Sequence, residues 1–308
     1  MVRPFFLSRH SKTPQPKKPY FCFDGPLKPI PMKKTCFLLP VFALLLAWQP
    51  VRAQVAIAPS TVFISDATNV GTLYVSNRSD EPQEVNIEFA FGYPSSDQDG
   101  NLVMNYQDSA AFELYALNDW IRAFPRSFIL GPRQQQTVRF QVRPRPNIPD
   151  GVYWTRVRVL ANPQTAEVDV PAEEGITTRI TFRFEQVIAA FYRKGNTTTG
   201  LHITQIDARQ QDQTLILLPH LHRTGNAPFV GSMIAKLYNQ SGEMVKERQS
   251  TTTAYFEEVR RIEIDVNELP AGQYRAEITF ETRRADMSPT DLVQAPPVTE
   301  SVNIQINK

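Results

Sequence analysis

Histidine is the residue type best suited to bind a metal ion in this chain, and three histidines follow residue 53. His220 and His222 stand two residues apart, which places both on one face of a β-strand. His202 is the third. A zinc site takes three or four protein ligands at short, recurring spacings, and no third ligand stands at such a spacing from the pair. The pair is therefore predicted to lie on the surface without a metal.

Other catalytic and cofactor-binding motifs are missing from the sequence. There is no Gly-rich phosphate loop, no nucleophile elbow and no metalloprotease helix. The acidic pair Glu257-Glu258 lies on a strand edge, where solvated charge is the expected state. We therefore expect a protein that is not an enzyme and that uses no cofactor.

A binding site of a different kind is indicated by residues 176–193, whose alternating pattern predicts one unusually long strand. Its large apolar residues stand two apart and therefore share one face. Two interpretations are open: these side chains fill the core of their own domain, or they are available to a partner. The apolar residues are Ile180, Phe182 and Phe184, and they alternate with Arg179, Thr181, Arg183 and Glu185.

The rest of the chain after Gln54 also alternates between apolar and polar residues, as half-buried strands do. Proline outnumbers glycine, 25 to 13, which favours strands joined by firm turns over long helices. Asn77 to Pro82 is predicted to be one such turn. The predicted strands cover residues 70–77, 85–91, 137–142, 153–159, 261–266 and 274–280.

An internal repeat identifies the type of β fold. The segments from Ile148 to Tyr153 and from Leu269 to Tyr274 share the pattern aliphatic, Pro, any, Gly, any, Tyr. This is the position of a tyrosine corner, in which a Tyr at the start of strand F donates a hydrogen bond back to the preceding connection. Two corners about one domain length apart predict an all-β chain of two immunoglobulin-like β-sandwich domains in tandem, at 54–193 and 194–308.

The beginning of the chain carries a targeting signal. Residues 32–53 form a signal peptide: basic residues after Met32, an apolar run over 37–48, and small residues at Val51 and Ala53 before the cleavage point. The apolar run is too short to span a bilayer comfortably. Residues 1–31 have no periodicity and are interpreted as an extension from a misassigned start. The mature chain is predicted to begin at Gln54.

Removal of residues 1–53 changes the charge and the thiol content. It takes away nine of the 33 basic and one of the 31 acidic residues, so the remaining 24 and 30 give a net charge of −6. The compositional argument for nucleic-acid binding is lost with the leader. Both cysteines, Cys22 and Cys36, are lost as well, so the mature chain can form no disulfide and must rely on buried cores.

The sequence resembles the PapD-like periplasmic pilus chaperones. The resemblance covers roughly residues 55–193 and rests on Leu73 to Asn77, on Ala123 to Pro132 followed by Val138-Arg139, and on the strand that ends in Phe191-Tyr192-Arg193. It implies that the last strand of the first domain lends apolar side chains to an incomplete pilin subunit. By position, Ile180, Phe182 and Phe184 are the donor residues.

The chain departs from this family at two positions. The family holds the subunit's C-terminal carboxylate with two basic residues, and those positions here are Ser60 and Ala189. The resemblance implies a periplasmic chaperone whose partners are secreted pilin-like or other surface subunits, with an outer-membrane usher as a further partner and no membrane span after signal removal. The alternative is a structural or adhesive immunoglobulin-like envelope protein, which the missing basic pair favours.

Overall fold

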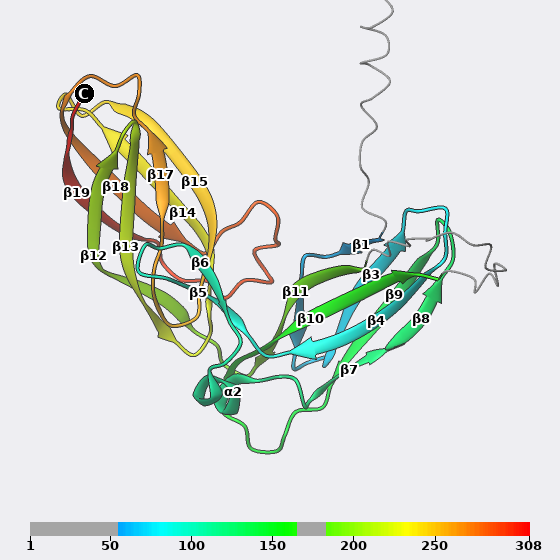
Figure 1. Cartoon of the computed structure of the whole chain (residues 1–308). Coiled ribbons are helices and arrows are strands. Elements are labelled where there is room, and N and C mark those ends of the chain that lie inside the picture. Colours follow the sequence, from blue (N-terminus) through cyan, green and yellow to red (C-terminus); the bar gives the residue numbers. More distant parts are fainter. Residues whose placement is uncertain (1–54, 165–182) are drawn as a thin grey trace, which may run out of the picture. The chain divides into compact units, whose positions relative to one another are not determined.

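The computed structural model describes residues 55–164 and 183–308 (Figure 1). The predicted extension, the signal peptide and Gln54 lie outside the described residues, as do residues 165–182. The regular secondary structure of the described residues consists of β-strands and one short helix, α2 (Ser109–Tyr115). The predicted all-β class, two immunoglobulin-like sandwiches in tandem, is confirmed.

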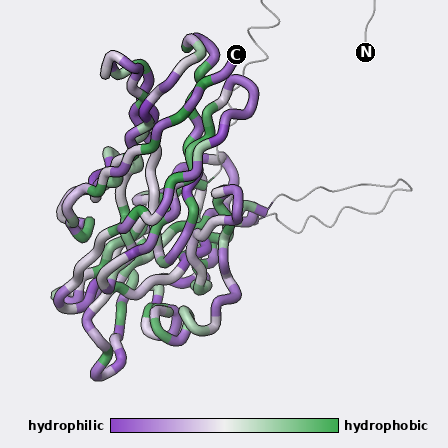
Figure 2. The backbone as a smooth tube through the Cα atoms, turned by 90° about the vertical axis from the view of Figure 1, so that its left-hand side faces the viewer, coloured by the Kyte–Doolittle hydropathy of each residue, from purple (hydrophilic) through white to green (hydrophobic). Residues whose placement is uncertain are grey.

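The first sandwich consists of two sheets. Along β3 and β9 buried and exposed residues alternate, and Figure 2 shows hydrophobic and hydrophilic residues alternating along much of the chain. The inner faces enclose one core cluster that includes Leu73, Phe140 and Val157. One sheet has the order β1 (Val55–Ala58), β3 (Val70–Asn77), β9 (Gln135–Val142), β7 (Ile121–Phe124), and the other has the order β2 (Thr61–Ser65), β11 (Phe184–Lys194), β10 (Gly151–Pro163), β4 (Gln83–Ala90), β8 (Ser127–Leu130).

The second sandwich has a core of its own, which includes Leu217, Ala235 and Phe280. β11 ends at Lys194 and β12 begins at Thr199, and the domain boundary near Lys194 stays a prediction. One sheet has the order β12 (Thr199–Gln211), β13 (Thr214–Gly225), β16 (Glu257–Val259), with β17 (Ile262–Asp265) also on β13. The other has the order β15 (Met244–Ala254), β14 (Phe229–Tyr238), β18 (Gly272–Glu281), β19 (Val298–Ile306).

Between β4 and β7 the chain forms a small hairpin of β5 (Tyr93–Ser96) and β6 (Leu102–Asn105), followed by α2. The hairpin contacts the second sandwich: the Ser96 hydroxyl accepts a hydrogen bond from the Val259 amide at 2.8 Å. Arg209 on β12 pairs with Asp99 in the hairpin loop at 2.8 Å. The sequence alone did not predict this hairpin.

Both predicted tyrosine corners are confirmed. The Tyr153 hydroxyl donates a hydrogen bond to the carbonyl of Pro149 at 2.9 Å, and the Tyr274 hydroxyl donates to the carbonyl of Pro270 at 2.9 Å. The six predicted strands correspond to β3, β4, β9, β10, β17 and β18.

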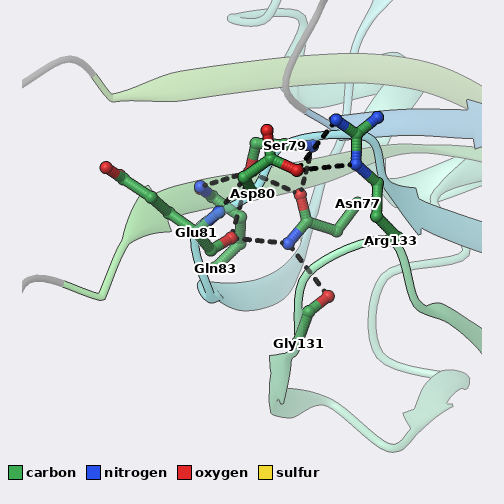
Figure 3. A network of polar contacts seen from close by, with 7 residues as sticks. All are labelled: Asn77, Ser79, Asp80, Glu81, Gln83, Gly131 and Arg133. Carbon is green, nitrogen blue, oxygen red and sulfur yellow. Dashed lines mark hydrogen bonds and ion pairs between the residues drawn. The ribbon is translucent and has the colours of Figure 1, made fainter.

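The predicted turn between β3 and β4 is organised by Asn77, whose side chain is buried (Figure 3). Its amide nitrogen donates to the carbonyls of Glu81, Leu130 and Gly131 at 2.7, 3.1 and 3.0 Å. Its amide oxygen accepts from the backbone and hydroxyl of Ser79. One side chain therefore ties the β3–β4 turn to the β8–β9 turn.

Candidate functional site

Strand β11 is paired unevenly on its two edges. On one edge it pairs with β10 along its whole length, from Phe184 opposite Ala161 to Lys194 opposite Gly151. On the other edge, β2 runs parallel to it only from Ala189 to Arg193. Within the described residues, the backbone of 184–188 therefore has no strand partner on this second edge.

The three predicted donor residues are described only in part. Ile180 and Phe182 lie outside the described residues. Phe184 is the first residue of β11, and its half-buried side chain packs against the core of the first sandwich. Ile188 belongs to the same core, whereas Val187 on the opposite face is 44% exposed. Phe184 therefore lies on the core-facing side of the sheet, at the part of β11 whose second edge is unpaired.

The family that the chain resembles carries basic residues at two positions, of which one here is Ala189 on β11 and the other is Ser60, just before β2. Ala189 is buried in β11 and pairs directly with Thr61, the residue after Ser60. Ser60 is exposed and lines a groove together with Asp286 and Asp291, so an acidic pair lies close to where the family has a cation.

A buried arginine lies on the neighbouring strand β10, directly opposite Ala189. Arg156 on β10 is the direct cross-strand partner of Ala189, so the two side chains share a face. Only 9% of Arg156 is exposed. Its Nε donates to the Gly92 carbonyl at 3.0 Å and Nη2 donates to the Tyr255 hydroxyl at 3.2 Å. Among the described residues it forms no ion pair with a carboxylate within 4.0 Å; its guanidinium instead lies over the Tyr255 ring, 5.8 Å from the ring centroid.

Arg156 lies beside a cluster of aromatic side chains drawn from both sandwiches. Tyr255 follows β15 in the second sandwich and is 1% exposed. Its ring centroid lies 4.8 Å from that of Trp154 and 6.2 Å from that of Phe191, both from the first sandwich. Burial raises the pKa of the Tyr255 hydroxyl, although the nearby Arg156 guanidinium acts against this. Leu292, from the loop between β18 and β19, is buried in the same cluster.

Sequence reasoning missed Arg156, and one local signal could have drawn attention to it. Tyr153 to Val157 alternate between the core face and the outer face, and on the outer face Arg156 follows the large apolar Trp154. An arginine next to a buried tryptophan on the same face indicates that this face is also covered. Alternation alone would place Arg156 on the solvent face of the strand.

The histidine and acidic pairs are also placed by the structure. His220 and His222 lie on β13 and are each hydrogen-bonded to one carboxylate, from Asp207 at 2.8 Å and from Glu257 at 3.0 Å. The prediction of solvated charge is wrong for Glu258, which is buried and pairs with Arg260 at 2.8 Å. Burial raises the pKa of Glu258 to about 7, and the Arg260 charge opposes that rise.

The described residues contain neither a helix long and apolar enough to cross a membrane nor a group of three or more His, Cys, Asp or Glu side chains arranged for a metal ion.

The sequence matches no protein-family model and no curated protein. Several solved structures are similar to it. The YadV chaperone covers 82% of this chain and 100% of its own length, at 13% identity and a TM-score of 0.43. A chain of the CsuC–CsuE chaperone–tip adhesion subunit pre-assembly complex, from archaic chaperone-usher Csu pili of Acinetobacter baumannii, covers 80% and 98%, at 12% identity and a TM-score of 0.41.

A chain of the complex between the Salmonella enterica SafA pilin and the SafB chaperone covers 80% of this chain and 96% of its own, at 13% identity and a TM-score of 0.38. All three structures are of chaperones or of complexes between a chaperone and a subunit. The two-sandwich fold itself rests on the strand order and the paired corners described above.

Proposed function

We propose that this chain is an exported chaperone that binds pilin-like or other surface subunits by donor-strand complementation through β11. The observation that carries the proposal is the uneven pairing of β11, whose backbone over 184–188 is unpaired on one edge among the described residues. Phe184, on the core-facing side of the sheet, lies in this unpaired part. An incomplete sandwich could pair with this edge and receive the apolar side chains into its own core.

The proposal extends to location and partners. The signal peptide over 32–53 would deliver the chain to the periplasm, where it would hold subunits and pass them to an outer-membrane usher. It would need neither a cofactor nor catalysis, because strand pairing and apolar insertion supply the binding. N-terminal sequencing of the exported protein should give Gln54 first, whereas a product that keeps Met1 or Met32 would contradict export by this signal.

The donor strand is tested by truncating its apolar face. Phe182→Ala and Phe184→Ala should reduce co-purification of secreted subunits, with only modest loss of thermal stability, because the Phe184 side chain is only half-buried and lies next to the unpaired edge. A strand buried entirely in its own core would instead lose about 3–5 kcal/mol per Phe→Ala. Val187→Ala, on the opposite face of the same strand, is the matched control and should retain subunits.

The outcome separates the two classes of function. Loss of subunits in both Phe variants and not in Val187→Ala supports donor-strand binding. Gross unfolding of Phe184→Ala, or subunit recovery equal to the parent, moves the assignment to the structural or adhesive envelope protein.

Arg156 is proposed as the group that anchors a client's C-terminal carboxylate in place of the absent basic pair. Arg156 is the direct cross-strand partner of Ala189, so the two side chains lie on the same face of the sheet. It is buried, and among the described residues it forms no ion pair with a carboxylate. A charge-assisted hydrogen bond to such a cation contributes about 1.5–3 kcal/mol. Loss of the guanidinium should therefore weaken binding of a free C-terminus by about tenfold or more.

The anchor is tested with one subunit-derived peptide made with a free and with an amidated C-terminus. The parent protein should prefer the free form, and Arg156→Gln should bind both forms equally. Arg158→Gln is the matched control, because Arg158 lies two residues along on the same face and is paired with Glu88 and Glu185. If the parent protein binds the free and the amidated peptide equally well, or if Arg156→Gln keeps the preference for the free peptide, Arg156 is not the anchor.

A further inference from the structure

All histidines in the described residues lie on two neighbouring strands of the second sandwich. His202 on β12 and His222 on β13 are direct cross-strand partners. Directly opposed residues of an antiparallel pair share a face, with Cβ atoms about 5 Å apart. The strand register thus supplies the neighbour for His222 that residue spacing did not reveal. Both side chains are exposed, so a solvated ion can reach them.

Glu257 sets which ring nitrogen of His222 carries the proton. It is the direct partner of His222 on β16, and its Oε1 lies 3.0 Å from His222 Nδ1. A carboxylate accepts the Nδ1 proton, so the lone pair of the neutral ring is left on Nε2. Donation from the second ring nitrogen to a carboxylate is the usual support of a metal-binding histidine, and it raises the basicity of the ligating nitrogen.

Carboxylates near His222 favour the binding of a cation. His222 and Glu257 line an open groove of about 470 Å³ together with Asp97 from the β5–β6 hairpin loop. Hydrogen bonds from Asn101 lower the pKa of Asp97, so this carboxylate is ionised at neutral pH. His220 also lines this groove and is hydrogen-bonded through Nε2 to Asp207, outside its lining, at 2.8 Å. Negative charge along a groove raises the local concentration of cations.

We propose that His202 and His222 bind one divalent transition-metal ion, with Glu257 positioning the His222 ring and water completing the coordination. The proposed site has two protein ligands, fewer than the three or four of a structural or catalytic zinc site, so water fills the remaining positions. Imidazole nitrogen suits Zn²⁺, Ni²⁺ and Cu²⁺ better than Mg²⁺ or Ca²⁺, which take oxygen ligands. This inference is independent of the proposed chaperone function.

Isothermal titration of untagged protein with Zn²⁺ and, separately, with Mg²⁺ tests the site. All samples carry His10→Asn, Cys22→Ser and Cys36→Ser, so that no histidine or cysteine before Gln54 remains. We expect saturable binding of one Zn²⁺ with a dissociation constant below about 100 μM and no detectable Mg²⁺ binding. Zn²⁺ binding weaker than about 1 mM, or equal affinity for both ions, overturns the proposal.

Variants of exposed side chains assign the ligands without disturbing the fold, which circular dichroism verifies. His202→Asn and His222→Asn should each weaken Zn²⁺ binding by about tenfold or more, and Glu257→Gln should weaken it by about tenfold. His220→Asn is the matched control, two residues from His222 on the same strand, and should change the affinity by less than about threefold. An unchanged affinity in His202→Asn, or an equal loss in His220→Asn, overturns the assigned ligand pair.

Discussion

The hydroxyl groups of Tyr153 and Tyr274 make equivalent hydrogen bonds at equivalent places in the two sandwiches. Each ring is buried, so little water can replace the lost hydroxyl as the donor to the proline carbonyl. Tyr153→Phe and Tyr274→Phe should therefore each lower the free energy of unfolding by about 1 kcal/mol in urea denaturation. Tyr74→Phe, at an exposed position of β3, is the control and should change it little. No loss in either corner variant would contradict the importance of the hydroxyl.

Glu258 makes stability depend on pH. Burial raises its folded-state pKa to about 7, above the ordinary value of 4.5, so the folded protein binds this proton more tightly than the unfolded chain. The stabilisation from this group is complete below the unfolded-state pKa and is lost as pH rises through about 7.

Glu258→Gln keeps the shape of the side chain and removes the titration. The parent protein should lose about 2 kcal/mol more unfolding free energy than the variant between about pH 5 and pH 8, because each pKa unit corresponds to about 1.4 kcal/mol. Urea denaturation of both proteins at the two pH values measures the difference. Parallel pH profiles would show that Glu258 is ionised throughout that range.

At the scale of elements, the β3–β4 turn depends on one buried amide. Asn77→Ala removes a side chain that is 2% exposed and leaves the carbonyls of Glu81, Leu130 and Gly131 without this donor. The free energy of unfolding should fall by about 2–3 kcal/mol in urea denaturation. Asp80→Ala in the same turn is the control, because its ion pair with Arg133 is exposed and should contribute less than about 1 kcal/mol. Equal losses in both variants would contradict the role of Asn77.

The elements themselves could be predicted because their signals are local. Alternation marked β3, β10 and β18, and the Pro-x-Gly-x-Tyr pattern marked the start of each corner strand. The neighbours of a residue in other strands could not be predicted, since register depends on pairing between distant segments. Arg156 opposite Ala189 and His202 opposite His222 are both products of register. The candidate anchor and the candidate metal site therefore became visible only in the structure.

At the scale of the whole molecule, the aromatic cluster determines how the two sandwiches unfold. Trp154 and Phe191 come from the first sandwich and Tyr255 from the second, so loss of either sandwich exposes apolar surface of the other. We expect the parent protein to unfold in one cooperative transition, with calorimetric and van't Hoff enthalpies equal. The observation that would contradict this coupling is two separate transitions in the parent.

Removal of the Tyr255 ring should uncouple the sandwiches. Tyr255→Ala deletes contacts with Trp154 and Phe191 and the acceptor of the Arg156 hydrogen bond, while the core of the second sandwich around Phe280 is left intact. Its calorimetric trace should resolve into two transitions, or its van't Hoff enthalpy should fall below the calorimetric value. Phe280→Ala is the control, because it lowers the stability of the second core without touching the cluster. Cooperative unfolding retained in Tyr255→Ala would mean that other contacts suffice for the coupling. These are the hairpin contacts Ser96–Val259 and Arg209–Asp99, and the Lys194–Thr199 connection, where Asp150 accepts hydrogen bonds from Lys194 and from the Asn196 amide.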